Sequence, residues 1–145
     1  MHERWAVTDA AAAMAAGTLV YIDIRSTAEV EQGLPAGAYH VPLFDAGPFG
    51  MVPNGNFAAE VAAVLAEVAP TRCAVACAHG VRSRQAVGLL AMAGIEVDEV
   101  PGGWDGLRDG WGGVVAPGWS HASLPVEARP AAGRDHASIR LRVAE

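Results

Sequence analysis

Residues 73–94 read "CAVACAHGVRSRQAVGLLAMAG", and this stretch decides the fold. Its first five residues are apolar and predict a buried central strand. Residues 83–94 predict a helix that closes at Gly94. A glycine-containing turn between Cys77 and Arg82 connects the two elements. Strand, turn and helix make up the unit of parallel α/β proteins, in which sites form beyond the carboxyl ends of strands.

The rest of the chain repeats this alternation. We expect further strands at 18–24, 38–43 and 96–100, and further helices at 9–16, 26–33 and 57–69. Thr8 is the expected cap of the first helix, and "STAE" at 26–29 has the form of a capping box. The Gly-, Pro- and Asn-rich residues 44–56 are expected to be a loop. The pattern favours a parallel sheet with helices on both faces.

Composition limits the classes of partner. The chain has 145 residues, enough for one domain with a sizeable core, and 52% of them are hydrophobic. Its net charge is −6 with no basic run, so we expect neither nucleic acid nor an anionic membrane as a partner. No apolar stretch has the length of a membrane-spanning helix. Glu3 and Asp9 lie in or before the N-terminal alanine run, which we interpret as a helix and not as a signal peptide.

The two cysteines indicate the redox compartment. Cys73 and Cys77 lie on one predicted strand, roughly 13 Å apart if it is extended. That separation excludes a disulfide between them. Without a histidine pair nearby they do not make a zinc site, so we expect no metal and no other cofactor. A reducing cytoplasm is the expected location.

The periodic pattern breaks down after residue 113. Residues 114–145 are interpreted as an irregular C-terminal extension of a domain that spans 1–113. Within the extension, "SIRLRV" at 138–143 alternates apolar and basic residues. This alternation predicts an edge strand, on the chain's own sheet or on that of a partner. We expect the segment to be packed and ordered.

The turn after the central strand carries the candidate chemistry. The free N–H groups and dipole of the following helix would favour a thiolate at Cys77. Gly80 permits a tight turn, Arg82 offers a planar fork to an oxyanion, and Ser83 can cap the helix or donate its hydroxyl to the sulfur. A cysteine at a strand end can also be an inert buried residue. The Cys-x4-Arg interval is one residue shorter than the phosphate-binding Cys-x5-Arg loop of tyrosine phosphatases.

Four segments together resemble the rhodanese (sulfurtransferase) domain family, over roughly residues 4–112. They are "YIDIRSTAEVEQG" (21–33), "PAGAYHVPL" (35–43), "CAHGVRS" (77–83) and "GLLAMAGIEVDEVPGGW" (88–104). The third matches the family's Cys-x-x-Gly-x-Arg-Ser loop. The resemblance implies a five-stranded parallel sheet flanked by helices, and a monomer or homodimer.

The resemblance also implies a reaction without a bound cofactor. Cys77 would accept sulfane sulfur from thiosulfate or a persulfide, and pass it to a thiol or cyanide-like acceptor. The loop that binds the substrate would be made of Ala78, His79, Gly80, Val81, Arg82 and Ser83, with Arg82 placing an anionic donor. Position 78 lacks a second cation, which is unfavourable for thiosulfate as the donor.

Alternatives remain open from the sequence. A rhodanese-fold module could bind a partner protein without chemistry, and a phosphatase or arsenate reductase would use similar loop geometry. His79 could be a cation that lowers the thiol pKa, or an ordinary exposed histidine. We expect Asp23 and Arg25 to be structural, with Arg25 reaching Glu29 and Asp23 accepting loop N–H groups.

Overall fold

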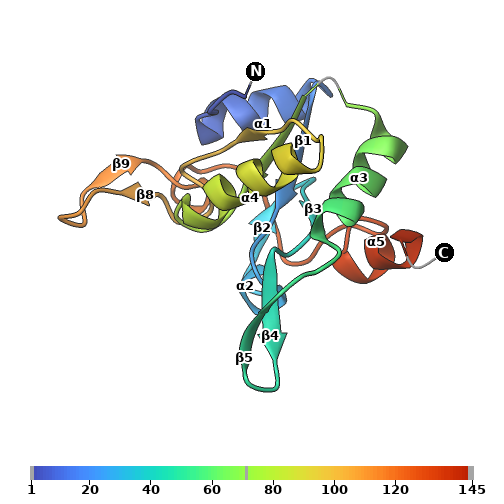
Figure 1. Ribbon diagram of the computed structural model, residues 1–145. Helices are drawn as coiled ribbons and strands as arrows, with labels where there is room; N and C mark the ends of the chain where they lie inside the picture. The colour runs from blue at the N-terminus through green and yellow to red at the C-terminus, as the bar shows by residue number, and fades with distance from the viewer. Residues whose placement is uncertain (1, 71, 144–145) are drawn as a thin grey trace.

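The computed structural model describes residues 2–70 and 72–143 (Figure 1). The helices are α1 (Val7–Ala15), α2 (Thr27–Val30), α3 (Phe57–Val68), α4 (Val81–Met92) and α5 (His136–Val143), with a 3-10 turn η1 (Trp119–His121). The strands are β1 (Leu19–Asp23), β2 (Leu34–Pro35), β3 (Tyr39–His40), β4 (Phe44–Gly47), β5 (Gly50–Pro53), β6 (Arg72–Ala76), β7 (Asp98–Glu99), β8 (Leu107–Arg108), β9 (Val114–Ala116) and β10 (Val126–Glu127).

A parallel sheet with the strand order β3-β1-β6-β7 forms the centre of the molecule. This α/β architecture confirms the predicted fold class. The described residues give four strands instead of the expected five, but a parallel bridge between Arg4 and Glu99 adds one further row beside β7. β1 and β6 pair over their whole lengths, from Leu19 opposite Arg72 to Asp23 opposite Ala76.

Helices cover both faces of this sheet. The side chains of β1 and β6 alternate between two apolar clusters, one on each face. Val20, Ile22 and Val75 point into the cluster that contains residues of α3, α4 and α5. Tyr21 and Ala74 point into the opposite cluster, which contains α1 and Trp119. Both faces are therefore buried, as the continuous apolar runs of these strands predict.

Two of the local sequence signals gave different results. The capping box at α2 is confirmed: the Ser26 hydroxyl accepts the N–H of Glu29, and the Glu29 carboxylate accepts the N–H of Ser26. The expected cap at Thr8 is wrong. α1 begins at Val7 after Ala6, whose side chain offers no acceptor, so Thr8 lies inside the helix.

Residues 44–56 are not only a loop. β4 and β5 form an antiparallel hairpin that projects from the body of the molecule (Figure 1). Two of the glycines that suggested a loop, Gly47 and Gly50, flank its turn, and Gly50 has a φ of +118°. A positive φ at this position of a hairpin favours glycine. The glycine content of the segment therefore reflects the turn and gave no indication of the two strands beside it.

The prediction of an edge strand at 138–143 is wrong, and residues 114–145 are not irregular throughout. Residues 136–143 form α5, which packs beside α3 (Figure 1). Ile139 and Trp119 are buried in the two apolar clusters. The segment is ordered and packed, although the division into 1–113 and 114–145 stays a prediction. In the described part of the chain, every helix is too short or too polar to span a bilayer.

Candidate active site

Cys77 directly follows β6, at the carboxyl end of the central strand. Its residue is 2% exposed, and its sulfur accepts the backbone N–H groups of Gly80 at 3.2 Å and Ser83 at 3.3 Å. α4 begins at Val81 with Gly80 as its N-cap, so the positive end of the helix dipole points toward this sulfur.

Ser83 has a different role from the two that we expected. Because Gly80 is the N-cap, Ser83 lies in the first turn of α4 and does not cap the helix. Its hydroxyl donates to the Gly80 carbonyl at 3.2 Å, and the group that it offers to the sulfur is its backbone N–H. The hydrogen bond from the Ser83 hydroxyl to Gly80 joins the first turn of α4 to the turn that precedes it.

Two glycines make the tight loop possible. Gly80 has a φ of +85°, and a Cβ atom there would lie 2.8 Å from the carbonyl oxygen of Pro101. At Gly103, a Cβ atom would lie 2.1 Å from the carbonyl oxygen of Cys77. The next N–H, that of Trp104, donates to the same carbonyl at 2.9 Å. The turn after β7 therefore supports the loop from behind.

The guanidinium of Arg82 is engaged by a carboxylate. Nη1 and Nη2 donate to the two oxygens of Glu29 at 2.6 and 2.9 Å. This bond lowers the pKa of Glu29 to about 2 and raises that of Arg82. The fork that the sequence analysis assigned to an anionic donor is thus occupied by Glu29 in this structure. Arg82 instead connects the loop to α2, which is anchored by its capping box.

The remaining loop residues differ in exposure. Ala78 is buried, whereas Val81 is 69% exposed. The ring of His79 donates from Nδ1 to the carbonyl of Gly106 at 3.0 Å, and its Nε2 lies 3.7 Å from Asp105. His79 thus faces an acid of its own, and its influence on Cys77 stays a prediction.

A pocket of about 330 Å³ lies beside the loop, and it includes an arginine that the sequence analysis missed. Arg84 is exposed and makes no hydrogen bond or ion pair with the described residues. The spacing of the motif does not single out Arg84. The two arginines differ in that Arg82 pairs with Glu29, and this contact is not visible in the sequence. The pocket is lined by His79, Gly80, Val81, Arg84, Gln85 and Leu107.

Asp23 and Arg25 form a buried structural pair, as expected, and Asp23 accepts the backbone N–H of Arg25 at 3.0 Å. Arg25 donates to both Asp23 oxygens, at 2.8 to 3.1 Å, and to the carbonyl of Gly33 at 2.8 Å. Its guanidinium also lies 4.7 Å from the centre of the Trp104 ring. The expected contact with the Glu29 carboxylate is wrong, because Arg82 occupies that carboxylate.

The second cysteine has an environment of another kind. Cys73 is a free, buried thiol within β6, and burial raises its pKa to about 12. It lies on the same face of the strand as Cys77 and belongs to the same apolar cluster. Residues 2–70 and 72–143 contain no group of three or more His, Cys, Asp or Glu side chains that could hold a metal ion.

Fold and loop together define an α/β protein with a cysteine in an N–H-lined turn, and comparison with known proteins gives the family. The model of the rhodanese-like domain matches residues 6–109. The chain therefore belongs to the rhodanese-like domain family.

Individual relatives agree with this assignment. A protein of Arabidopsis thaliana named "Thiosulfate sulfurtransferase 16, chloroplastic" is 31% identical over 108 residues, which cover 74% of this chain and 79% of the relative. The crystal structure of Rv0390 from M. tuberculosis superimposes with a TM-score of 0.65 at 26% identity, over 87% of this chain and 97% of that one. A rhodanese-related protein of Thermoplasma volcanium has the same fold, with a TM-score of 0.53 at 21% identity, over 88% and 100% of the two chains.

Proposed function

We propose that this protein is a sulfurtransferase that carries sulfane sulfur on Cys77. The observation that supports this most strongly is the pair of backbone N–H groups, from Gly80 and Ser83, that point at the Cys77 sulfur. They would stabilise the attacking thiolate, and they are fixed by the backbone before any substrate arrives. The substrate loop of the proposal comprises Ala78, His79, Gly80, Val81, Arg82 and Ser83.

The first half-reaction loads the sulfur. The Cys77 thiolate attacks the outer sulfur of thiosulfate, and a new S–S bond forms. The S–S bond of thiosulfate breaks, and sulfite leaves with the electron pair. Because Cys77 is 2% exposed, a donor that presents a terminal sulfur atom reaches it more easily than a bulky group.

The second half-reaction unloads it. A thiolate or cyanide attacks the outer sulfur of the persulfide, and the S–S bond returns its electron pair to Cys77. With cyanide the product is thiocyanate. Donor and acceptor thus react in turn at one nucleophile, without a metal or a bound cofactor.

The pocket beside the loop supports a role for Arg84 in this proposal. Glu29 neutralises Arg82, so among the described residues that line the pocket beside the loop, Arg84 is the unpaired cation. We assign to Arg84 the attraction of the sulfonate end of thiosulfate, or of the carboxylates of a small persulfide. Arg82 is then a positioning residue that fixes the loop against α2.

The competing functions are weaker in this geometry. A phosphatase or arsenate reductase needs room for a tetrahedral oxyanion, and the Cys-x4-Arg loop is one residue shorter than the phosphate-binding loop. A partner-binding module of the same fold has no use for N–H groups directed at a sulfur. A cytoplasmic location, and a monomer or homodimer without nucleic-acid or membrane partners, complete the proposal, since a thiolate persists in a reducing compartment.

Intact mass spectrometry tests the proposal. The reduced protein is incubated with thiosulfate, desalted and weighed, and then treated with cyanide. We expect the gain of one sulfur atom, removed by cyanide with release of thiocyanate. Glutathione persulfide, as a second donor, distinguishes a wrong donor from a wrong function.

A matched pair of variants identifies the sulfur. Cys77→Ala should gain no sulfur from either donor. Cys73→Ala, four residues earlier on the same face of β6, should gain it as the wild type does. If neither donor loads the wild type, or if Cys77→Ala is loaded equally, sulfur transfer through Cys77 is excluded. Hydrolysis of an aryl phosphate by the wild type would support the phosphatase instead.

A further inference from the structure

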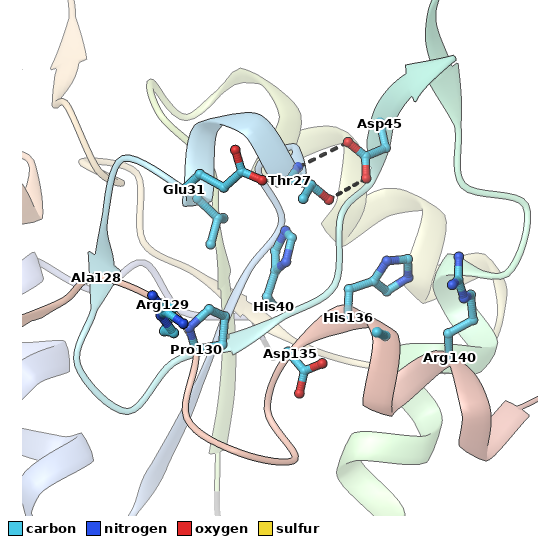
Figure 2. A pocket seen from close by; sticks show the side chains of 12 residues that line it. Thr27, Glu31, His40, Asp45, Ala128, Arg129, Pro130, Asp135, His136 and Arg140 are labelled. Carbon is cyan, nitrogen blue, oxygen red and sulfur yellow. Dashed lines mark hydrogen bonds between the residues drawn. The ribbon is translucent and has the colours of Figure 1, made fainter. Parts of the chain in front are cut away.

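A second pocket, of about 560 Å³, lies at the carboxyl edge of the sheet beside β3 (Figure 2). α2, β3, the segment 128–130 and the start of α5 enclose it, and no residue of the loop 77–83 lines it. Neither the proposed reaction nor the family comparisons account for this pocket. Its apolar wall consists of Val30, Ala128, Pro130 and Ala137.

A buried histidine with a free nitrogen lines this pocket. His40 is 3% exposed, and its Nε2 lies 2.8 Å from the carbonyl oxygen of Arg25. A carbonyl only accepts, so Nε2 carries the hydrogen, and burial lowers the pKa of the ring. The other nitrogen, Nδ1, is then a lone pair. No donor in the described part of the chain reaches it.

The charged residues around the pocket divide into two groups. The carboxylates of Asp45 and Asp135 are already satisfied within the protein: Asp45 accepts the N–H and hydroxyl of Thr27, and Asp135 accepts those of Ser138. By contrast, Arg129, Arg140 and Glu31 are exposed and form no ion pair with the described residues. Figure 2 shows both arginines at the border of the pocket. The unpaired charges around the pocket are therefore two cations, Arg129 and Arg140, and one carboxylate, that of Glu31.

The second imidazole of the pocket is fixed from behind. His136 donates from Nε2 to the carboxylate of Glu60, a residue of α3 that is completely buried, at 2.9 Å. The rings of His40 and His136 are 6.1 Å apart and nearly perpendicular. Both rings are therefore held in place before any ligand enters, which lowers the entropic cost of binding.

We propose that this pocket binds a small organic acid that also carries a hydroxyl group. The hydroxyl donates to Nδ1 of His40, the body of the ligand lies against the apolar wall, and the carboxylate pairs with Arg140, at the border of the pocket opposite to Arg129. The ligand contacts α2 through Thr27 and Val30, whereas Glu29 of the same helix binds Arg82 of the loop. Binding in this pocket does not require the sulfur chemistry of Cys77, because no residue of the loop 77–83 lines it.

Three related probes separate the contributions: 4-hydroxyphenylacetate, phenylacetate without the hydroxyl, and 4-hydroxyphenylethanol without the carboxylate. Binding is measured by NMR titration of the full chain, followed on the imidazole signals of His40 and His136. We expect saturable shifts with 4-hydroxyphenylacetate, and about 3- to 10-fold weaker binding of each truncated probe. The absence of saturable shifts, or equal affinity for all three, would overturn the proposal.

Variants test the two contacts. Gln at position 40 can place its amide N–H near the position of Nε2, so His40→Gln keeps the donor to Arg25 and removes the acceptor Nδ1. It should abolish the preference for the hydroxylated probe and leave the fold intact by circular dichroism. Arg140→Gln should weaken both carboxylate probes about 2- to 5-fold. Arg108→Gln, on the exposed strand β8, is the matched control. Unchanged selectivity in His40→Gln would exclude His40 as the contact.

The result is separable from the proposed function. The titration reads binding and not turnover, so Cys77→Ser should bind 4-hydroxyphenylacetate as the wild type does. Loss of binding in Cys77→Ser would place the ligand at the loop and overturn the assignment to this pocket.

Discussion

At the scale of single residues, two pairs of like side chains have opposite environments. Cys73 is surrounded by apolar groups within a strand, whereas Cys77 receives two N–H groups at the end of it. Both terminal nitrogens of Arg82 donate hydrogen bonds to Glu29. Arg84, two residues later, is exposed and unpaired among the described residues. Residue type alone distinguishes neither pair.

The contrast between the arginines predicts a kinetic difference. Arg84→Gln should raise the KM for thiosulfate about 2- to 5-fold with little change in kcat, because an exposed cation contributes to binding and not to bond breaking. The effect should shrink as salt increases, since exposed charges are screened. Steady-state kinetics at two ionic strengths measure it. Arg129→Gln removes the same charge in the other pocket and should leave KM unchanged.

The sequence predicted part of this site. The motif located Cys77 and Gly80 correctly at the turn, because strand, turn and helix are adjacent in the chain. The partner of Arg82 could not be found in this way, since Glu29 is 53 residues away and reaches it only through the packing of α2 against the loop. The same packing displaced Arg25 from its expected partner.

At the scale of elements, the start of α4 depends on the left-handed backbone conformation of Gly80. Gly80→Ala should lower the free energy of unfolding by about 1 to 3 kcal/mol, because alanine is strained at a φ of +85° and its Cβ would meet Pro101. Sulfur loading should fall with it. Chemical denaturation and intact mass measure the two effects.

The same helix offers the control. Gly88 lies in the middle of α4, and a Cβ atom there would have no neighbour within 4 Å. Gly88→Ala should therefore raise stability by about 0.5 to 1 kcal/mol and leave loading unchanged. If both alanine variants behave alike, the conformation of Gly80 is not what positions the sulfur.

The contact between α2 and the loop predicts a dependence on pH. Arg82 lowers the pKa of Glu29 from 4.5 to about 2, so the pair stabilises the fold fully above the ordinary value. This contribution is lost as the pH falls from 4.5 toward 2. Glu29→Gln should lower stability at neutral pH by about 1 to 2 kcal/mol, a figure reduced for solvent screening at this half-buried site.

Glutamine can still serve in a capping box, so this variant isolates the ion pair. Urea unfolding of wild type and Glu29→Gln from pH 7 down to pH 2 should show two curves that converge at the acidic end. A constant difference across this range would contradict the assignment of the effect to the charge.

At the scale of the whole molecule, the sequence predicted the central layers and misjudged the last segment. The apolar runs of β1 and β6 can only be buried strands, and both formed as expected. Residues 138–143 were ambiguous: Ile139 and Val143 are spaced for a helix as well as for a strand. Packing against α3, which a local pattern does not contain, decides for the helix.

Helix and strand make different demands on neighbouring residues. A strand would place Ile139 and Leu141 on the same face, whereas α5 buries Ile139 completely and leaves Leu141 67% exposed. Ile139→Ala should therefore lower the free energy of unfolding by about 2 to 5 kcal/mol. Leu141→Ala should change it by less than about 0.5 kcal/mol. Equal losses in denaturant titrations of the two variants would contradict the helical packing.

The burial of Ile139 also has a consequence for folding during synthesis on the ribosome. The apolar cluster that receives this side chain is built from β1, α3 and β6, all of which are synthesised earlier. A growing chain can pair these elements but leaves an apolar gap on α3 until α5 has emerged. Folding is therefore completed only after the C-terminal helix has been translated, and products of interrupted translation present this gap to chaperones and proteases.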